Sequence, residues 1–99
     1  MIAVLFDFEV RAGRFDDYLA LATELRAELE QIDGFLSVER FAALADEHRY
    51  LSLSLWRDQD AVKRWREQAR HRAAQAHGKA EIFSRYRILV TEVLRDYGA

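Results

Sequence analysis

The order of hydrophobic periodicities along the 99 residues constrains the fold of this chain more than any other feature. Four segments are rich in β-branched and aromatic residues or alternate between apolar and polar positions, as strands do. These segments are residues 2–10, 35–44, 49–56 and 86–95. Apolar residues recur at helical spacing over residues 14–32 and again from Gln59 onward. The sequence therefore predicts the order strand, helix, strand, strand, helix, strand in one domain spanning residues 1–99.

This order predicts an α+β fold of ferredoxin-like βαββαβ type, because right-handed β-α-β connections place both helices on one face of a four-stranded antiparallel sheet. The segment 49–56 has two distinct faces. One face carries Leu51, Leu53 and Leu55, and the other carries Tyr50, Ser52, Ser54 and Trp56. We expect the leucine face to meet the helices. The opposite face would then be semi-apolar and uncovered, which predicts a homodimer formed by packing of two sheets.

Three local signals mark the helix ends. Asp33 and Gly34 follow the first helical pattern, and glycine suits a left-handed position after a helix. Asp58 is placed to cap a helix that begins near Gln59. The apolar phase of this second helix is lost around residues 68–70, which predicts two helical pieces with a bend between them.

Composition excludes several classes of partner. The 15 basic and 17 acidic residues are interspersed and give a net charge of −2, so no basic stripe is present to neutralise nucleic-acid phosphates. The chain has no cysteine, which excludes disulfides and thiolate metal sites and fits a cytoplasmic setting. No stretch is long and apolar enough to predict a membrane span.

Several segments resemble domains of the antibiotic biosynthesis monooxygenase (ABM) family. They read GFLSVERF, LSLSLWRDQDAVKRWRE, HRAAQAHG and YRILVTEVLRDYG. The most specific match is the turn Trp56-Arg57-Asp58 followed by Trp65 and His71. The resemblance implies a dimeric α+β barrel with a pocket between the helices and the sheet of each protomer. For well-known members it also implies oxygenation of electron-rich aromatic molecules by O2 without metal or flavin.

We expect the pocket to be walled by Phe6, Tyr18, Leu53 and Trp65, with His71 and Trp65 as the catalytic candidates. A neutral imidazole at His71 could accept a proton from a phenol or hydroquinone near neutral pH. Trp65 can equally be a core anchor, since a buried indole contributes a large apolar area, and His71 can be a helix-cap or surface histidine. Polar side chains inside a mainly apolar pocket could come from Tyr18, Tyr50, Tyr86 and Arg40.

Another branch of the family degrades haem in the same pocket, with an asparagine on the first strand and a histidine ligand beyond the tryptophan. Here the asparagine position falls on Phe6 and the ligand position on Gln75, with His77 out of register. His71 and His77 are six residues apart and do not form a metal pair. We therefore expect no haem, metal or other cofactor, and a cofactor-independent monooxygenase that acts on a small aromatic or quinol-like molecule. The alternative is a non-catalytic dimeric barrel that binds a small apolar ligand or serves in stress response.

Overall fold

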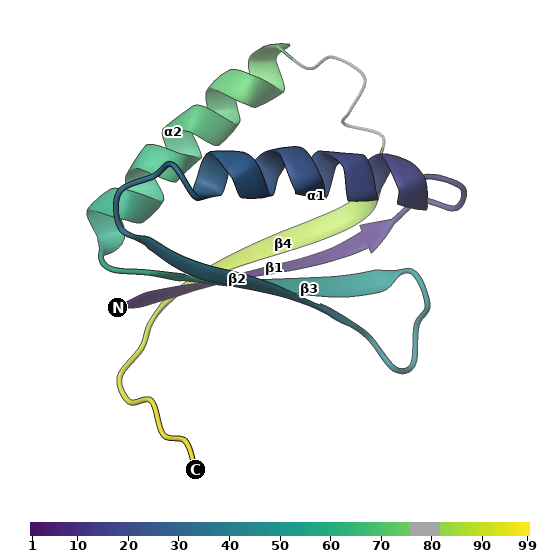
Figure 1. Cartoon of the computed structure of the whole chain (residues 1–99). Helices are drawn as coiled ribbons and strands as arrows, with labels where there is room; N and C mark the ends of the chain where they lie inside the picture. Colours follow the sequence, from purple (N-terminus) through teal and green to yellow (C-terminus); the bar gives the residue numbers. More distant parts are fainter. Residues whose placement is uncertain (76–81) are drawn as a thin grey trace.

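The computed structural model describes residues 1–75 and 82–99, and the side chains of residues 1–69 and 82–99. A four-stranded antiparallel sheet forms one layer and two helices form the other, both on the same face of the sheet (Figure 1). The elements are β1 (Ile2–Val10), α1 (Phe15–Leu29), β2 (Phe35–Ala42), β3 (Arg49–Trp56), α2 (Gln59–Gln75) and β4 (Phe83–Glu92). The strands lie in the order β2-β3-β1-β4. The predicted ferredoxin-like fold is confirmed.

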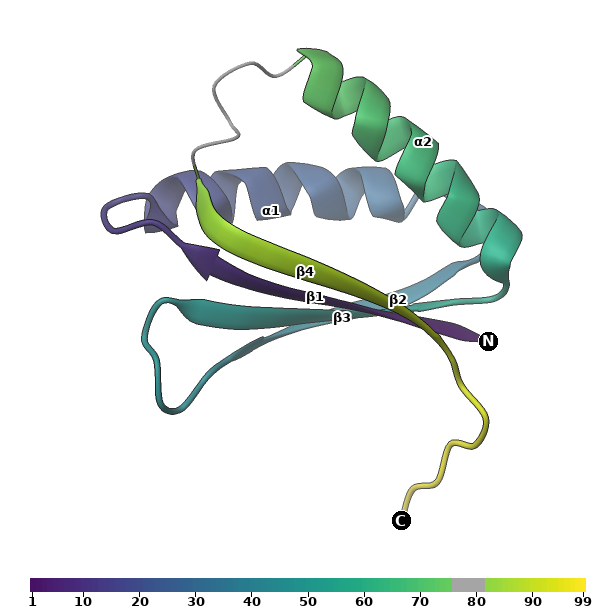
Figure 2. The ribbon, with the colours of Figure 1, turned by 180° about the vertical axis from the view of Figure 1, so that it is seen from behind.

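The helices cover the sheet unevenly. Figures 1 and 2 both show α1 lying along the sheet, while α2 slopes away from it toward its C-terminal end. The bounds of β1 and β3 are as predicted, whereas β4 begins at Phe83 rather than at residue 86. The second helix is continuous from Gln59 to Gln75, so the prediction of two pieces with a bend is wrong. Charged residues within one helix broke the apolar pattern without breaking the helix.

The turn after α1 is tied to the start of α2. Gly34 has a φ of 96°, in the left-handed region, and its carbonyl accepts a hydrogen bond of 2.7 Å from the Arg57 backbone N–H. A Cβ at Gly34 would lie 2.6 Å from the Cβ of Ala61, so the two backbones approach closely only because this residue has no side chain. Asp58 accepts a hydrogen bond of 2.9 Å from the Ala61 N–H, which confirms the predicted helix cap.

The two faces of β3 point in the reverse of the predicted directions. Strand pairing sets Ser52 opposite Phe6 and Leu53 opposite Leu5. The even-numbered residues of β1 face the helices and include Val4 and Phe8, which are each 1% exposed. The serines of β3 therefore face the helices and its leucines face outward, so the expected leucine contact with the helices is wrong. The inward face carries the two large rings of the strand, Tyr50 and Trp56, and Trp56 is fully buried there, which contributes a large apolar area.

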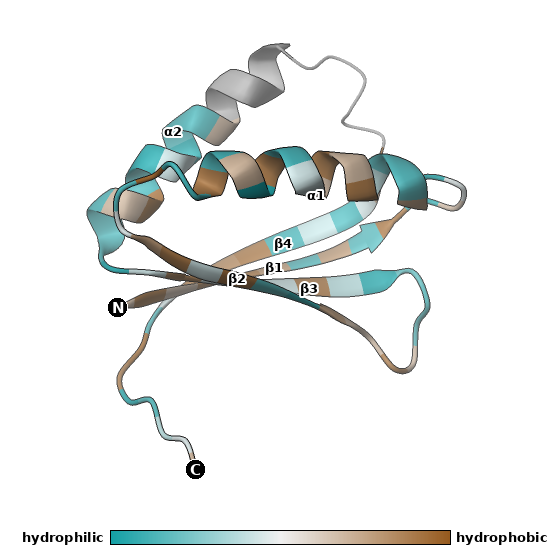
Figure 3. Cartoon of the chain, in the orientation of Figure 1, coloured by the Kyte–Doolittle hydropathy of each residue, from teal (hydrophilic) through white to brown (hydrophobic). Residues whose placement is uncertain are grey.

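Two clusters of buried side chains fill the layer between helices and sheet. The tryptophan cluster lies at the N-terminal end of α2 and comprises Ile2, Val4, Leu29, Ile32, Val38, Trp56, Ala61 and Val62. The tyrosine cluster lies toward the N-terminal end of α1 and comprises Phe8, Val10, Tyr18, Ala22 and Ile82. Figure 3 shows the alternation along β3 that divides its residues between this layer and the outer face, as brown and pale bands.

Candidate functional site

A cavity of about 430 Å³ lies between the two clusters, under both helices. All four strands and both helices contribute to its lining, which is mostly apolar. Its walls include members of the tryptophan cluster, such as Val4 and Leu29, and of the tyrosine cluster, such as Phe8 and Ala22. The hollow is thus part of the core layer itself, where a small apolar ligand would be removed from water on several sides.

One row of side chains across the sheet forms the floor of the cavity and is graded in polarity. The row runs through Arg40 on β2, Ser52 on β3, Phe6 on β1 and Ile88 on β4. All four residues line the cavity. A cationic group and a hydroxyl therefore lie at one edge of the sheet, and an aromatic ring and an aliphatic chain lie toward the other.

A bulge in β2 brings Arg40 into this row. Phe35 pairs with Trp56, but Ser37 already pairs with Leu55, so Leu36 is an extra residue in the strand. The extra residue inverts the alternation that follows. Val38 and Arg40 face the helices as a result, and Val38 is buried in the tryptophan cluster.

Tyr18 lines the cavity, and its hydroxyl has no hydrogen-bond partner among the described residues. The side chain is 7% exposed, and the hydroxyl oxygen itself is buried. Its ring packs against Phe8 with a centroid distance of 5.0 Å and against Tyr50 at 5.9 Å. Burial raises the pKa of Tyr18 above its usual value, an effect that the nearby Arg40 guanidinium opposes. Tyr18 is therefore a neutral O–H donor at physiological pH.

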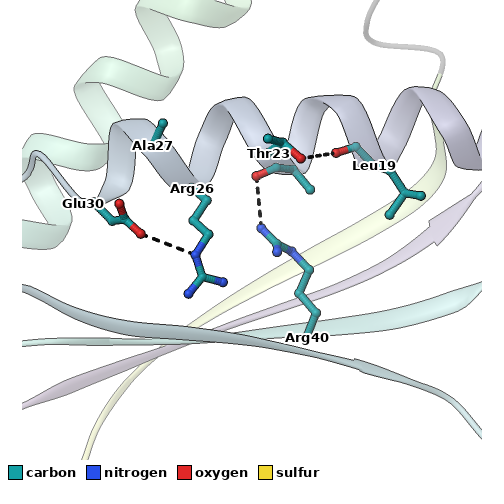
Figure 4. Close-up of a pocket in the computed structure, with 7 residues that line it drawn as sticks. Leu19, Thr23, Arg26, Ala27, Glu30 and Arg40 are labelled. Carbon is teal, nitrogen blue, oxygen red and sulfur yellow. Dashed lines mark hydrogen bonds and ion pairs between the residues drawn. The ribbon is translucent and has the colours of Figure 1, made fainter.

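Arg40 reaches from β2 toward α1 and makes few contacts there that stabilise the fold. Its Nη2 donates one hydrogen bond of 3.3 Å to the Ala22 carbonyl, and it forms no ion pair with any residue whose side chain is described (Figure 4). Arg40 also lines an open groove along the outside of α1, where Arg26 points toward β2 from the helix. Arg26, in contrast, is paired with Glu30 at 3.4 Å. A guanidinium has five N–H donors, so most of those on Arg40 are available to a ligand.

The predicted site residues separate into two groups. Phe6, Tyr18 and Trp65 line the cavity together. Trp65 also packs against the tryptophan cluster, with its ring 5.7 Å from that of Trp56, so it is both core and cavity wall. Leu53 lies on the outer face, opposite Leu5 and Glu39, and the cavity lining does not include it. His71 lies within the range of α2, but its side chain is outside the described residues, as is all of His77.

Sequence reasoning missed the two serines of β3 as part of the site. Ser54 accepts a hydrogen bond of 2.9 Å from the Trp56 indole N–H, which satisfies that fully buried ring. Ser52 lines the cavity beside it. Small polar residues placed between two aromatic residues on one strand face were the available signal, since they leave space where a core would otherwise be filled.

The outer face of the sheet is apolar at its centre and charged at one end. Leu53, Leu5 and Leu89 form one row across three strands. At the charged end, Asp7 accepts two hydrogen bonds from Arg49, of 3.0 and 2.7 Å, and lies 3.7 Å from Arg87. These contacts hold the pKa of the Asp7 carboxyl below its usual range, with the Arg49 hydrogen bond as the largest cause. Asp7 thus pairs within its own chain.

Metal-ligating residues do not gather anywhere in the part of the chain that is described: no group of three or more histidine, aspartate or glutamate side chains could hold an ion there. Within the same residues, neither helix is long and apolar enough to cross a membrane.

Comparison with known proteins identifies the family. Residues 1–77 match the model of the family described as antibiotic biosynthesis monooxygenase. This chain belongs to that family. The ABM protein jasmonate monooxygenase of the fungus Pyricularia oryzae is 40% identical over 93 residues, which are 94% of this chain. The chain spans 43% of the length of that curated relative.

Solved structures of ABM-like proteins share the fold. SnoaB, a cofactor-independent oxygenase from Streptomyces nogalater, aligns with a TM-score of 0.78 at 14% identity, over 96% of this chain and 94% of its own. The haem degrader MhuD of Mycobacterium tuberculosis, solved with two haems in its active site, aligns with a TM-score of 0.76 at 21% identity, over 99% and 100% of the two chains. At such identities the likeness establishes a common fold, and the chemistry must be argued from this chain's own residues.

Proposed function

We propose that this ABM chain is a monooxygenase that oxidises a small aromatic or quinol-like molecule in the cavity between its helices and sheet, without a resident metal or organic cofactor. The observation that carries the proposal is the cavity itself. It is a 430 Å³ hollow, mostly apolar and bordered by Phe6 and Trp65, in a chain of a monooxygenase family. The substrate ring would stack against these aromatic side chains.

The reaction needs a proton acceptor and no external reductant. A hydroquinone reacts with O2 to give a hydroxyquinone and water, so one oxygen atom enters the ring and the other leaves as water. The substrate supplies all the electrons. Removing a hydroxyl proton makes the anion that reduces O2, and we assign this step to the imidazole of His71 as general base. Trp65 would hold the ring and keep water from the anion.

Oxygen uptake tests this proposal. The purified chain, treated with a chelator, is given quinols and anthrones in an oxygen electrode. We expect uptake with at least one compound and a fall in kcat of about a hundredfold or more in His71→Ala. His48→Ala is the matched control, since His48 is exposed in the β2–β3 turn beside Glu47.

Three results would count against this proposal. No uptake with any compound, together with ordinary ligand binding, would favour a non-catalytic binding protein. Unchanged turnover in His71→Ala would remove His71 from the mechanism. A Soret band on titration with haem, coupled to haem breakdown, would move the chain to the haem-degrading branch, which the phenylalanine at position 6 and glutamine at position 75 disfavour.

We further propose that the chain forms a homodimer through its outer sheet face, as expected for a dimeric α+β barrel. No layer of the described residues covers the row Leu53, Leu5 and Leu89, and Leu89 is 40% exposed. Light scattering should give twice the 11.6 kDa protomer mass. Leu53→Asp should give the single mass, and Leu44→Asp, at a fully exposed leucine of the β2–β3 turn, should not. A single-chain mass for the unaltered protein would contradict the dimer.

A further inference from the structure

Two side chains with unused donors, Tyr18 and Arg40, line the polar end of the cavity. The Tyr18 hydroxyl is buried with no hydrogen-bond partner among the described residues, on a side chain more than nine-tenths buried. Arg40 makes one hydrogen bond to a backbone carbonyl and no ion pair with a described side chain. The Ala22 carbonyl that Arg40 contacts lies four residues, about one helical turn, beyond Tyr18 on α1. Both line the same cavity, from α1 and from β2.

A buried donor without an acceptor destabilises the folded chain, and a ligand atom that accepts a hydrogen bond from it removes that cost. An arginine fork matches the two oxygens of a carboxylate, and the hydrogen bonds are charge-assisted. Phosphate would carry more charge than the cavity can satisfy, because Arg40 is the one cationic residue in the lining among the described side chains. Arg40 is exposed and therefore solvated when no ligand is bound, so a carboxylate is preferred over a neutral carbonyl through the stronger, charge-assisted hydrogen bonds it accepts.

We infer that the cavity takes its ligand as an organic carboxylate, with the carboxylate at Arg40 and Tyr18 and the apolar body directed along the floor toward Phe6 and Ile88. The graded row supports this orientation, since it changes from guanidinium through the Ser52 hydroxyl to ring and aliphatic chain across the four strands. This inference rests on the proposed function for the identity of the site and adds the chemical class of the substrate.

Binding of matched naphthalenes tests the inference without any turnover. Titration calorimetry with 2-naphthoate and with its neutral counterpart 2-naphthamide should show about a tenfold to hundredfold preference for the carboxylate. Arg40→Met should reduce this preference to about twofold or less, and Arg40→Lys should restore part of it. Tyr18→Phe should weaken naphthoate binding about twofold to tenfold and leave naphthamide less affected. Arg26→Met is the control, because Arg26 does not line the cavity and is paired with Glu30.

Equal affinity of the unaltered protein for the two compounds would overturn the carboxylate assignment, as would an unchanged preference in Arg40→Met. Tighter binding of 2-naphthyl phosphate than of 2-naphthoate would overturn it in favour of a phosphate ester. Thermal unfolding of each variant establishes that it is folded. Oxygen uptake on neutral quinols, combined with no preference for naphthoate over naphthamide in binding, would contradict this inference and leave the proposed function intact. A preference for naphthoate with no oxygen uptake on any substrate would contradict the proposed function and leave this inference intact.

Discussion

The two faces of the sheet differ in what their polar and apolar residues do. On the inner face, beneath the helices, β3 carries Ser52 and Ser54 between two large rings, and the small side chains leave a cavity. On the outer face the same strand carries leucines that are only partly buried. The strand therefore turns its leucines outward and its serine hydroxyls toward the core.

This difference shows that the layer between helices and sheet is built around a space rather than packed full. Protein interiors are ordinarily close-packed, so a hollow of this size among buried rings needs small residues at its floor. The leucines in turn supply an outer surface that a second layer could cover. Ligand binding and association are therefore assigned to opposite faces of one strand, and substitutions at neighbouring positions should separate the two properties.

The largest expected effect is a loss of stability at Trp56, which we compare with the loss at its outward-facing neighbour Leu55. Trp56 is fully buried, so Trp56→Ala should lower the free energy of unfolding by about 3–5 kcal/mol. Leu55→Ala, one residue earlier on the partly covered face, should lower the free energy of unfolding by about half as much or less. The measurement is made at low protein concentration, where the chain is not associated. Chemical denaturation measures both. Equal losses would mean that the two faces are equally covered.

The second largest loss of stability is expected at Gly34, which closely approaches Ala61 at the packed end of the inner layer. Gly34→Ala should cost about 2–3 kcal/mol, since the residue has positive φ and its Cβ would lie 2.6 Å from that of Ala61. Gly13→Ala is the matched control, with a φ of 77° and nothing within 4 Å of the added carbon. It should cost about 1 kcal/mol. The difference between the two variants measures how tightly this end is packed compared with the cavity.

Filling the cavity should change binding more than stability. Ser52→Leu adds apolar volume to a site that has room for it, so the free energy of unfolding should change by about 1 kcal/mol or less. Affinity for naphthoate should fall at least about tenfold. Leu53→Ser on the outer face should leave affinity unchanged. A Ser52→Leu variant that binds normally would show that ligands occupy some other place.

The smallest effect concerns acid stability of the outer face. Because Arg49 lowers the pKa of Asp7, this carboxylate stabilises the folded chain above its unfolded pKa, near 3.9, and loses that contribution as pH falls through the lower folded pKa. Asp7→Asn should therefore lower the unfolding midpoint slightly at pH 7, and the difference should shrink toward pH 3. Asp16→Asn, at an exposed position of α1, is the control. A difference that grows toward low pH would contradict the assigned pairing.

Hydrophobic period predicted the element order and the cap at Asp58, since both depend on residues close together in the sequence. It could not predict which face of β3 turns inward. Alternation defines two faces, but leucines are common on surfaces as well as in cores. Which face of β3 turns inward is seen only from the pairing of Ser52 with Phe6 across the sheet. The direction of Arg40 depends on the extra residue Leu36 in β2, which pairing with β3 reveals and local sequence does not. The cavity was expected from the family resemblance. Its polar end could be identified only from the strand register, which places Arg40 beside Ser52.

The row Arg40, Ser52, Phe6 and Ile88 takes one residue from each strand, and the strands adjacent in space are not all adjacent in sequence. A molecule held along this row contacts the chain only when all four strands have assembled, so its binding energy is withheld from every partly folded form. By mass action, a ligand at a hundred times its dissociation constant would stabilise the native state by about 2.7 kcal/mol. A substrate of this protein would thus act on its lifetime in the cell, sparing the occupied chains from proteases that attack the unfolded ones.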